Sequence, residues 1–321
     1  MIRVLSVDGG GIRGIIPATF LVEFEKRTGK ATCELFDLIA GTSTGGLLAA
    51  GLTLPDESGR PKYTAQQMLD AYFDDGGSIF HKNLLRRIVT LGGLIGPKYS
   101  GRPLEKTLVN YLGDARLHEV LTELLIPAYD MASSTPWFFK TSHAKQTRTL
   151  AGNPLLIQVV RATTAAPTYF PPLTMEGHCM IDGGVFAGNP ALCAYAQARN
   201  VHPDETEFLV VSLGTGQEPH NLPCSKIRGW GVAGWVAPIN TVMLNASSAT
   251  VNYQMRALVG GKNYTRFQVQ LDDSTAAMDD ASLSNMLRLK EIADQAVMQH
   301  SEKIDTLCQT LLQENSCRSP S

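Results

Sequence analysis

The sequence has no excess of charge of either sign. Its 28 Lys and Arg residues are balanced by 30 Asp and Glu residues, which gives a formal net charge of −2 at pH 7. A groove that binds nucleic acid needs a clustered positive field to neutralise phosphates. The balance therefore argues against a nucleic-acid polymer as the main partner and leaves room only for a local anion pocket.

The sequence also lacks long apolar runs. No stretch reaches the roughly 18 uninterrupted apolar residues that a membrane span needs. The opening residues, MIRVLSVD, lack the layout of a signal peptide. We therefore expect a cytoplasmic protein with only peripheral access to the membrane.

Cysteine and histidine are sparse and scattered. The six cysteines stand singly, without a C-x-x-C pair, and no two of the seven histidines have His-x-x-x-His spacing. Zinc and redox sites need such spacing, because several side chains must reach one ion or each other. The sequence therefore predicts reduced thiols, no metal and no cofactor.

What the sequence does contain is a repeated strand–turn–helix pattern. Hydrophobic residues make up 44% of the 321 residues, which suits one large α/β domain. The β-branched run over residues 2–7 ends at three glycines and leads into an apolar-periodic run over 15–24, and residues 36–40 and 44–52 repeat the scheme. Two such units predict a parallel sheet with helices on its faces and ligands at the carboxyl ends of its strands.

Further segments extend this single predicted domain over residues 1–313. Strands are expected at 124–128, 137–140, 179–181, 208–213 and 264–269, and one long helix over 283–312 should pack across the sheet. Residues 76–101 are expected to form either a cap that meets lipid or a core helix with solvated basic residues. Residues 314–321 are expected to form a flexible tail.

The first chemical motif is Gly41-Thr42-Ser43-Thr44-Gly45, a G-x-S-x-G between a predicted strand and a predicted helix. A nucleophilic serine needs this context, because the sharp turn exposes its Oγ and the following helix directs its positive end at developing negative charge. The pattern makes Ser43 a candidate nucleophile. A plain structural turn is the alternative interpretation.

The second motif, residues 8–14 (DGGGIRG), formally satisfies G-x-G-x-x-G. A nicotinamide-dinucleotide site would also need an acidic residue at the end of the next strand, but Asp37 lies at its beginning. The other interpretation is an oxyanion hole, because glycines let backbone N–H groups approach a tetrahedral intermediate and Arg13 adds positive charge. The candidate oxyanion residues are Gly9, Gly10, Gly11 and Arg13.

The third motif is Asp182-Gly183-Gly184, which follows an apolar pair. It matters because Ser43 needs a base and no histidine lies in a recognisable triad context. An Asp can serve if burial raises its proton affinity and it accepts the serine hydroxyl directly. Asp182 is therefore the candidate base, and an ordinary Asp-Gly turn is the alternative.

Taken in order, the three motifs resemble those of the patatin-like phospholipases. Supporting blocks at residues 96–101, 126–130, 161–171 and 212–216 extend the likeness over residues 1–270. The resemblance implies a three-layer α/β/α sandwich with a mainly parallel central sheet. By motif, it makes Ser43 the nucleophile, Asp182 its partner, and the Gly9 to Gly11 turn with Arg13 the oxyanion site.

The resemblance also implies an activity. A phospholipase A type enzyme would cleave glycerophospholipid esters at a membrane surface through a Ser43–Asp182 dyad, without a metal. The layout further resembles the lone patatin-like effectors that some bacteria pair with cyclic-oligonucleotide synthases in antiphage defence. That likeness implies activation by a cyclic di- or oligonucleotide.

Three questions stay open at this point. The candidate anion-binding residues for such an activator are Lys82, Arg86, Arg87, Lys98 and Arg102. The alternative is that these residues form a solvated face. Trp230 and Trp235, around the Gly-rich residues 229–234, suit a membrane-facing flap, an activation loop or a surface turn. A ligand-binding signalling module with little or no lipase activity is the alternative function, and an oligomer is compatible with the sequence.

Overall fold

The computed structural model describes residues 1–80, 96–147, 149, 152–218 and 222–313. Its centre is an eight-stranded sheet in the order β5-β6-β3-β2-β1-β7-β8, with β4 paired to β3. The strands are β1 Ile2–Val7, β2 Leu38–Gly41, β3 Glu123–Asp130, β4 Thr135–Lys140, β5 Leu173–Met175, β6 His178–Asp182, β7 Phe208–Leu213 and β8 Tyr264–Phe267. Strands β3, β2, β1, β7 and β8 pair in parallel, and the remaining three are antiparallel additions.

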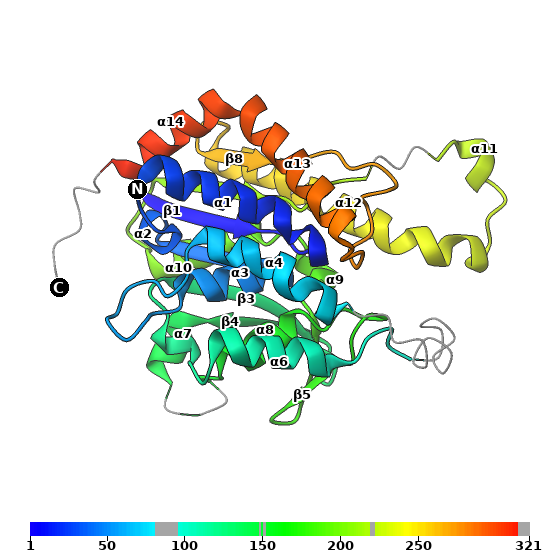
Figure 1. Ribbon diagram of the computed structural model, residues 1–321, viewed down its shortest axis with the longest axis horizontal. Helices are drawn as coiled ribbons and strands as arrows, with labels where there is room; N and C mark the ends of the chain where they lie inside the picture. Colours follow the sequence, from blue (N-terminus) through cyan, green and yellow to red (C-terminus); the bar gives the residue numbers. More distant parts are fainter. Residues whose placement is uncertain (81–95, 148, 150–151, 219–221, 314–321) are drawn as a thin grey trace.

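Helices cover both faces of the sheet (Figure 1). The elements that follow the first two strands are η1 Gly11–Gly14, α1 Ile15–Thr28, α2 Thr32–Leu35, α3 Thr44–Thr53 and α4 Ala65–Ile79. The middle of the chain adds α6 Gly101–Leu112, η3 Leu117–Glu119, α7 Thr141–Gln146, α8 Leu156–Thr163, α9 Gly184–Ala187 and α10 Ala191–Val201. The last helices are α11 Cys224–Ile227, α12 Val232–Val259, α13 Leu283–Gln299 and α14 Ser301–Leu312.

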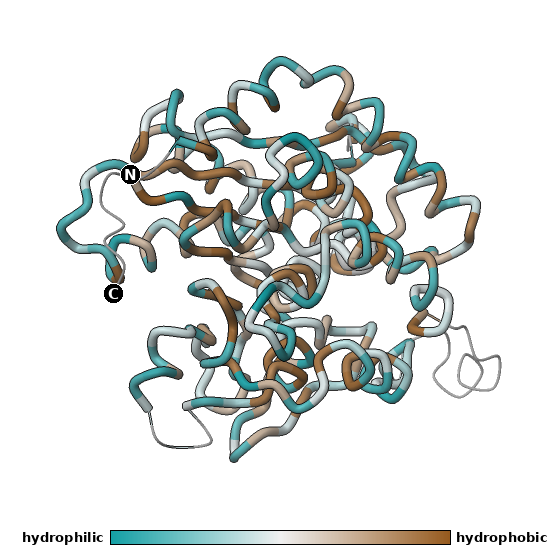
Figure 2. Tube along the Cα trace, turned by 60° about the vertical axis from the view of Figure 1, so that its left-hand side comes forward, coloured by the Kyte–Doolittle hydropathy of each residue, from teal (hydrophilic) through white to brown (hydrophobic). Residues whose placement is uncertain are grey.

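Alternation along the strands divides the core between the two faces. In β7, Leu209 and Val211 belong to the larger core under α1, α3 and α13, whereas Phe208 and Val210 belong to the smaller core under α10 and α12. Successive side chains of a strand point to opposite faces, so a strand buried on both sides is apolar throughout. The apolar central strands in Figure 2 show this, and the predicted three-layer α/β/α sandwich is confirmed.

The strand pairing explains how distant motifs meet. β4 occupies one edge of β3 over residues 125–130, so β6, which pairs with residues 128–130, takes the opposite edge. β2 occupies that same edge over residues 123–125 and runs the other way from β6. The carboxyl ends of β2 and β6 therefore point at each other, which brings the residues after Gly41 close to Asp182.

One sequence-based expectation about helices was wrong. The single helix expected over 283–312 is two helices, α13 and α14, separated at His300, and both pack on α1. Of the Gly-rich residues 229–234, the last three begin α12, which continues for 28 residues with Pro238 inside it. The flap, activation-loop and surface-turn interpretations stay predictions. The short strand β5 was not expected at all.

Other expectations fall partly outside the described residues. Of the cap expected over 76–101, residues 76–79 are the last turn of α4 and residue 101 begins α6, while residues 81–95 lie outside the described part. The tail expected over 314–321 also lies outside it, so both expectations and the 1–313 domain boundary stay predictions. Within the described ranges, no helix combines the length and apolarity needed to cross a bilayer.

Candidate active site

Ser43 lies at a sharp turn between β2 and α3. Its φ of 54° and ψ of −119° are strained for a residue with a side chain. Glycines make the turn possible, because a Cβ at Gly41 would overlap the carbonyl oxygen of Gly45, and a Cβ at Gly45 would overlap that of Val7. Ser43 is also the residue before the first turn of α3, where unpaired N–H groups give a helix its positive end.

Thr163, at the end of α8, holds this turn from the side. The Ser43 N–H donates to Thr163 Oγ1 at 3.0 Å, and the Thr163 hydroxyl donates in turn to the Pro127 carbonyl oxygen at 2.6 Å. The bond fixes the Ser43 backbone and leaves its half-buried side chain uncommitted to the helix.

Asp182, at the end of β6, faces the Ser43 side chain. The Ser43 hydroxyl lies close enough to the Asp182 carboxylate to influence its pKa, and Asp182 Oδ1 accepts the Gly184 N–H at 2.7 Å. Only 5% of Asp182 is exposed. Burial raises the pKa of its carboxyl from 3.8 to about 6, against the opposing effect of the Gly184 N–H and the Ser43 hydroxyl. A base of this strength beside a hydroxyl can accept its proton near neutral pH.

The Gly-rich turn after β1 lies directly beside Ser43. A Cβ added to Gly9 would lie 3.3 Å from the Ser43 Cβ, and a Cβ on Gly10 would overlap the Thr215 side chain. The Gly9 N–H donates to the Gly188 carbonyl oxygen at 3.0 Å. The N–H groups of Gly10 and Gly11 have no hydrogen-bond partner in the described part of the chain, so they are the donors of this turn that a ligand oxygen can use.

Arg13 lies in the same turn but is engaged elsewhere. Its Nη1 donates to Glu218 Oε1 at 3.3 Å and to the Ala276 carbonyl oxygen at 3.1 Å. Burial lowers the pKa of the guanidinium, and the charge of Glu218 opposes that effect. These contacts tie the Gly-rich turn to the later part of the chain. The direct part of Arg13 in an oxyanion hole stays a prediction.

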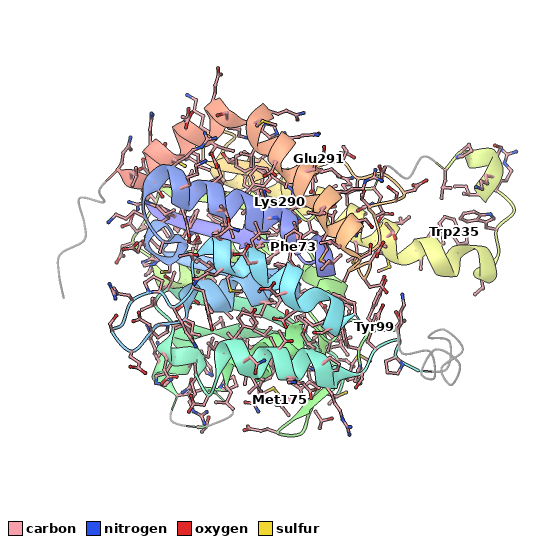
Figure 3. The ribbon with its side chains drawn as sticks, viewed as in Figure 1. Phe73, Tyr99, Met175, Trp235, Lys290 and Glu291 are labelled. Atoms are coloured by element: carbon pink, nitrogen blue, oxygen red, sulfur yellow. The ribbon has the colours of Figure 1, made fainter. Side chains whose placement is uncertain are left out.

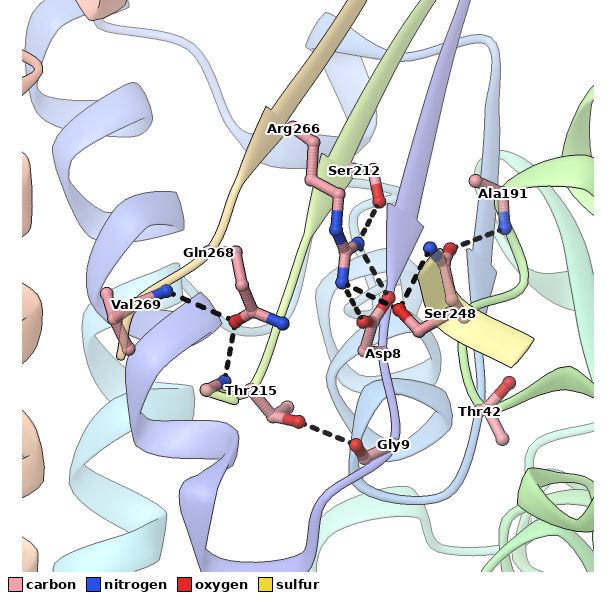
Figure 4. A network of polar contacts seen from close by, with 12 residues as sticks. Asp8, Gly9, Thr42, Ala191, Ser212, Thr215, Ser248, Arg266, Gln268 and Val269 are labelled. Carbon is pink, nitrogen blue, oxygen red and sulfur yellow. Dashed lines mark hydrogen bonds and ion pairs between the residues drawn. The ribbon is translucent and has the colours of Figure 1, made fainter. Parts of the chain in front are cut away.

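A buried network missed by the sequence reasoning positions the Gly-rich turn (Figure 4). Arg266 of β8 pairs with Asp8 (Nη2 to Oδ2, 2.6 Å) and donates to Ser212 Oγ at 2.6 Å. The Thr215 hydroxyl donates to the Gly9 carbonyl oxygen at 2.6 Å. Burial raises the pKa of Asp8, and the guanidinium of Arg266 opposes that rise. The signal in the sequence was a charged residue, Arg266, inside a segment expected to form a strand.

Two of the five residues suggested for an anionic activator, Lys98 and Arg102, lie in the described part of the chain. Lys98 forms an ion pair with Asp279, which also accepts the Tyr99 hydroxyl at 2.6 Å. Arg102 is exposed near the start of α6. The other three, Lys82, Arg86 and Arg87, lie outside the described residues.

The chain is similar to known proteins over most of its length. Residues 5–195 match the family model described as "Patatin-like phospholipase". "Patatin-like protein 2" of Oryza sativa subsp. indica is 36% identical, covering 95% of this chain and 86% of that protein. Two Solanum tuberosum proteins, each covering 92% of this chain, are "Probable inactive patatin-3-Kuras 1" (34% identical, 86% of that protein) and "Patatin-T5" (33%, 83%). The chain therefore belongs to the patatin-like phospholipase family, a family of hydrolases that act on carboxylic ester bonds.

Proposed function

We propose that this protein is a serine lipid acyl hydrolase of the phospholipase A type. The observation that carries the proposal is the approach of Ser43, at a strained backbone position, to the buried Asp182 carboxylate, whose pKa the Ser43 hydroxyl lowers. The substrate is a glycerophospholipid presented by a membrane.

The reaction starts when Ser43 Oγ attacks the ester carbonyl carbon while Asp182 accepts the hydroxyl proton. The N–H groups of Gly10 and Gly11 stabilise the oxyanion, assisted by the positive end of α3. The carbon–oxygen bond to the lysophospholipid then breaks, and Asp182 returns the proton to the departing oxygen. Water, deprotonated by Asp182, attacks the acyl carbonyl carbon. The bond from this carbon to Ser43 Oγ breaks, Asp182 returns the proton to Ser43, and the fatty acid leaves.

The test is release of fatty acid from vesicles of defined phospholipids by the wild-type chain and by Ser43→Ala. We expect the substitution to lower turnover by about three orders of magnitude or more, because the nucleophile cannot be replaced by its neighbours. The exposed Ser78→Ala is the matched control and keeps full turnover. A folded Ser43→Ala variant with wild-type turnover would refute the dyad.

A second candidate is a ligand-binding module on a hydrolase scaffold. It is favoured by one observation, a relative at 34% identity whose name describes it as inactive. A fluorophosphonate that labels activated serines separates the two candidates. Covalent labelling of Ser43 supports the hydrolase, and an unlabelled chain without fatty-acid release supports the binding module.

Activation by a cyclic di- or oligonucleotide, as in antiphage defence, is a finer part of the proposal. Its support is the resemblance in layout, together with the exposed cation of Arg102. The fatty-acid assay repeated with candidate cyclic nucleotides tests it. A rise in turnover supports a gated enzyme, whereas equal turnover with and without the nucleotides supports a constitutive one.

A further inference from the structure

An apolar arm projects from the body of the protein. It consists of α11 and the first half of α12, residues 224–243, and Figure 1 shows it extending from the end of the molecule toward which β1 points. Trp235 is labelled on this arm in Figure 3. Because the Gly-rich turn follows β1 and the Ser43 turn follows the parallel strand β2, the arm stands at the same end as the candidate active site.

One side of the arm carries an unusual amount of exposed apolar surface. Val232 is 83% exposed and Met243 59%, and Trp235, Ile239 and Val242 are also exposed. Val232, Trp235, Ile239 and Val242 follow each other at intervals of three or four, and Met243 stands four residues after Ile239, which places all five along one side of the helix. Trp230 packs edge-on against Trp235, with ring centroids 5.6 Å apart.

The opposite side of α12 packs on the body, next to the candidate site. Ser248 Oγ accepts from Arg266 at 3.1 Å, and Met255 is fully buried. A Cβ added to Gly188 would touch the Leu244 side chain at 3.4 Å. Helix α12 also contacts α9, which follows Asp182 and exposes Val185. The apolar stripe thus begins beside the Ser43–Asp182 pair and faces away from the core.

The segment that carries the stripe has charges of one sign. No acidic residue stands between Glu218 and Asp272 in a chain that is otherwise slightly acidic. Lys226 and Arg228 are exposed just before α12 begins. Two copies of such a surface would repel each other, whereas an anionic lipid surface would attract it.

We propose that the apolar arm is a membrane-docking surface that inserts into the headgroup region of an anionic phospholipid bilayer. The inference rests on the proposed function, since it places a lipid surface at the mouth of a site that consumes lipid. The helix lies in the interface with Val232, Trp235 and Met243 toward the acyl chains. Lys226 and Arg228 stay at the level of the headgroups, where tryptophan rings are also favoured.

The test is flotation of the full chain with vesicles of phosphatidylcholine alone or with 30% phosphatidylglycerol. We expect Trp235→Ser combined with Met243→Ser to lower vesicle binding by about tenfold or more. Hydrolysis of a water-soluble short-chain ester reports separately on the catalytic centre and should stay within about twofold. The matched control is Leu287→Ser with Met298→Ser, which removes exposed apolar side chains from α13 and leaves vesicle binding unchanged.

A second pair of changes tests the electrostatic part. Lys226→Ser combined with Arg228→Ser should reduce the preference for phosphatidylglycerol and the sensitivity of binding to salt.

Equal vesicle binding by wild-type and apolar-arm variants would overturn the inference. A change from oligomer to monomer in the arm variant, with vesicle binding unaltered, would also overturn it and make the arm a contact between copies.

The two proposals fail in different ways. Arm-dependent vesicle binding by a chain that releases no fatty acid keeps the docking surface and refutes the hydrolase. Fatty-acid release from vesicles that does not depend on the arm keeps the hydrolase and refutes the docking surface. Ser43→Ala should bind vesicles as well as the wild type.

Discussion

Asp182 holds a charge where a carboxylate is poorly solvated. The Gly184 N–H and the nearby Ser43 hydroxyl offset only part of the cost of burial, so its pKa rises to about 6. A general base must be deprotonated in the free enzyme. We therefore expect kcat/KM for a soluble ester to rise as the pH passes about 6 and to level off above it. A profile measured from pH 4.5 to 8 that is flat through this range would contradict the assignment.

The same shift predicts that the site costs stability. Because the folded-state pKa exceeds the unfolded value of 3.8, the stability that this carboxyl contributes is fully present below pH 3.8 and is lost as the pH rises through about 6. Asp182→Asn removes the ionisation and should stabilise the protein at pH 7.5 by up to about 3 kcal/mol. Thermal melts should show a higher Tm for the variant at pH 7.5 and little difference near pH 4. A lower Tm at pH 7.5 would count against this account.

At the scale of elements, the turn between β2 and α3 depends on glycine. A Cβ at Gly45 would overlap a backbone carbonyl that cannot move without displacing β1. We expect Gly45→Ala to destabilise the protein by about 3 kcal/mol or more. Gly77→Ala, in α4, has open space around the new Cβ and should instead stabilise by about 0.5–1 kcal/mol, since alanine favours helix. Urea unfolding of both variants checks the contrast, and equal effects would refute it.

Local signals explain which elements could be predicted. The turn at Ser43 follows from a short apolar strand, two glycines and an apolar helix, all within a few residues. Helix α12 was missed because Gly234 and Pro238 disfavour helix, while its buried contacts at Ser248 and Met255 come from other parts of the chain. No glycine or proline marks the break between α13 and α14 at His300, so no local signal predicts it. In the structure, both helices pack on α1.

At the scale of the whole molecule, the candidate site depends on residues far apart in the sequence. The three motifs, taken in order, resemble those of a known family, and this resemblance predicts Ser43 as the nucleophile and Asp182 as its base. It did not reveal the Arg266 guanidinium that pairs with Asp8, or the Thr163 hydroxyl that holds the Ser43 backbone. Such contacts depend on which strands become neighbours, and local sequence patterns do not specify strand order.

The match to the family model ends at residue 195, but two strands of the sheet, β7 and β8, come after that residue. β7 pairs with the whole length of β1, and β8 pairs with β7, so a chain ending at residue 201 would leave β1 with an open edge. It would also lose Phe208, Val210 and Tyr264 from the smaller core, and Arg266 from its buried pair with Asp8. We expect such a chain to aggregate and to show no cooperative melt or ester hydrolysis, whereas a chain ending at residue 313 should keep both. A cooperative melt with retained hydrolysis in the shorter chain would mean that the matched region folds without the strands that complete its sheet.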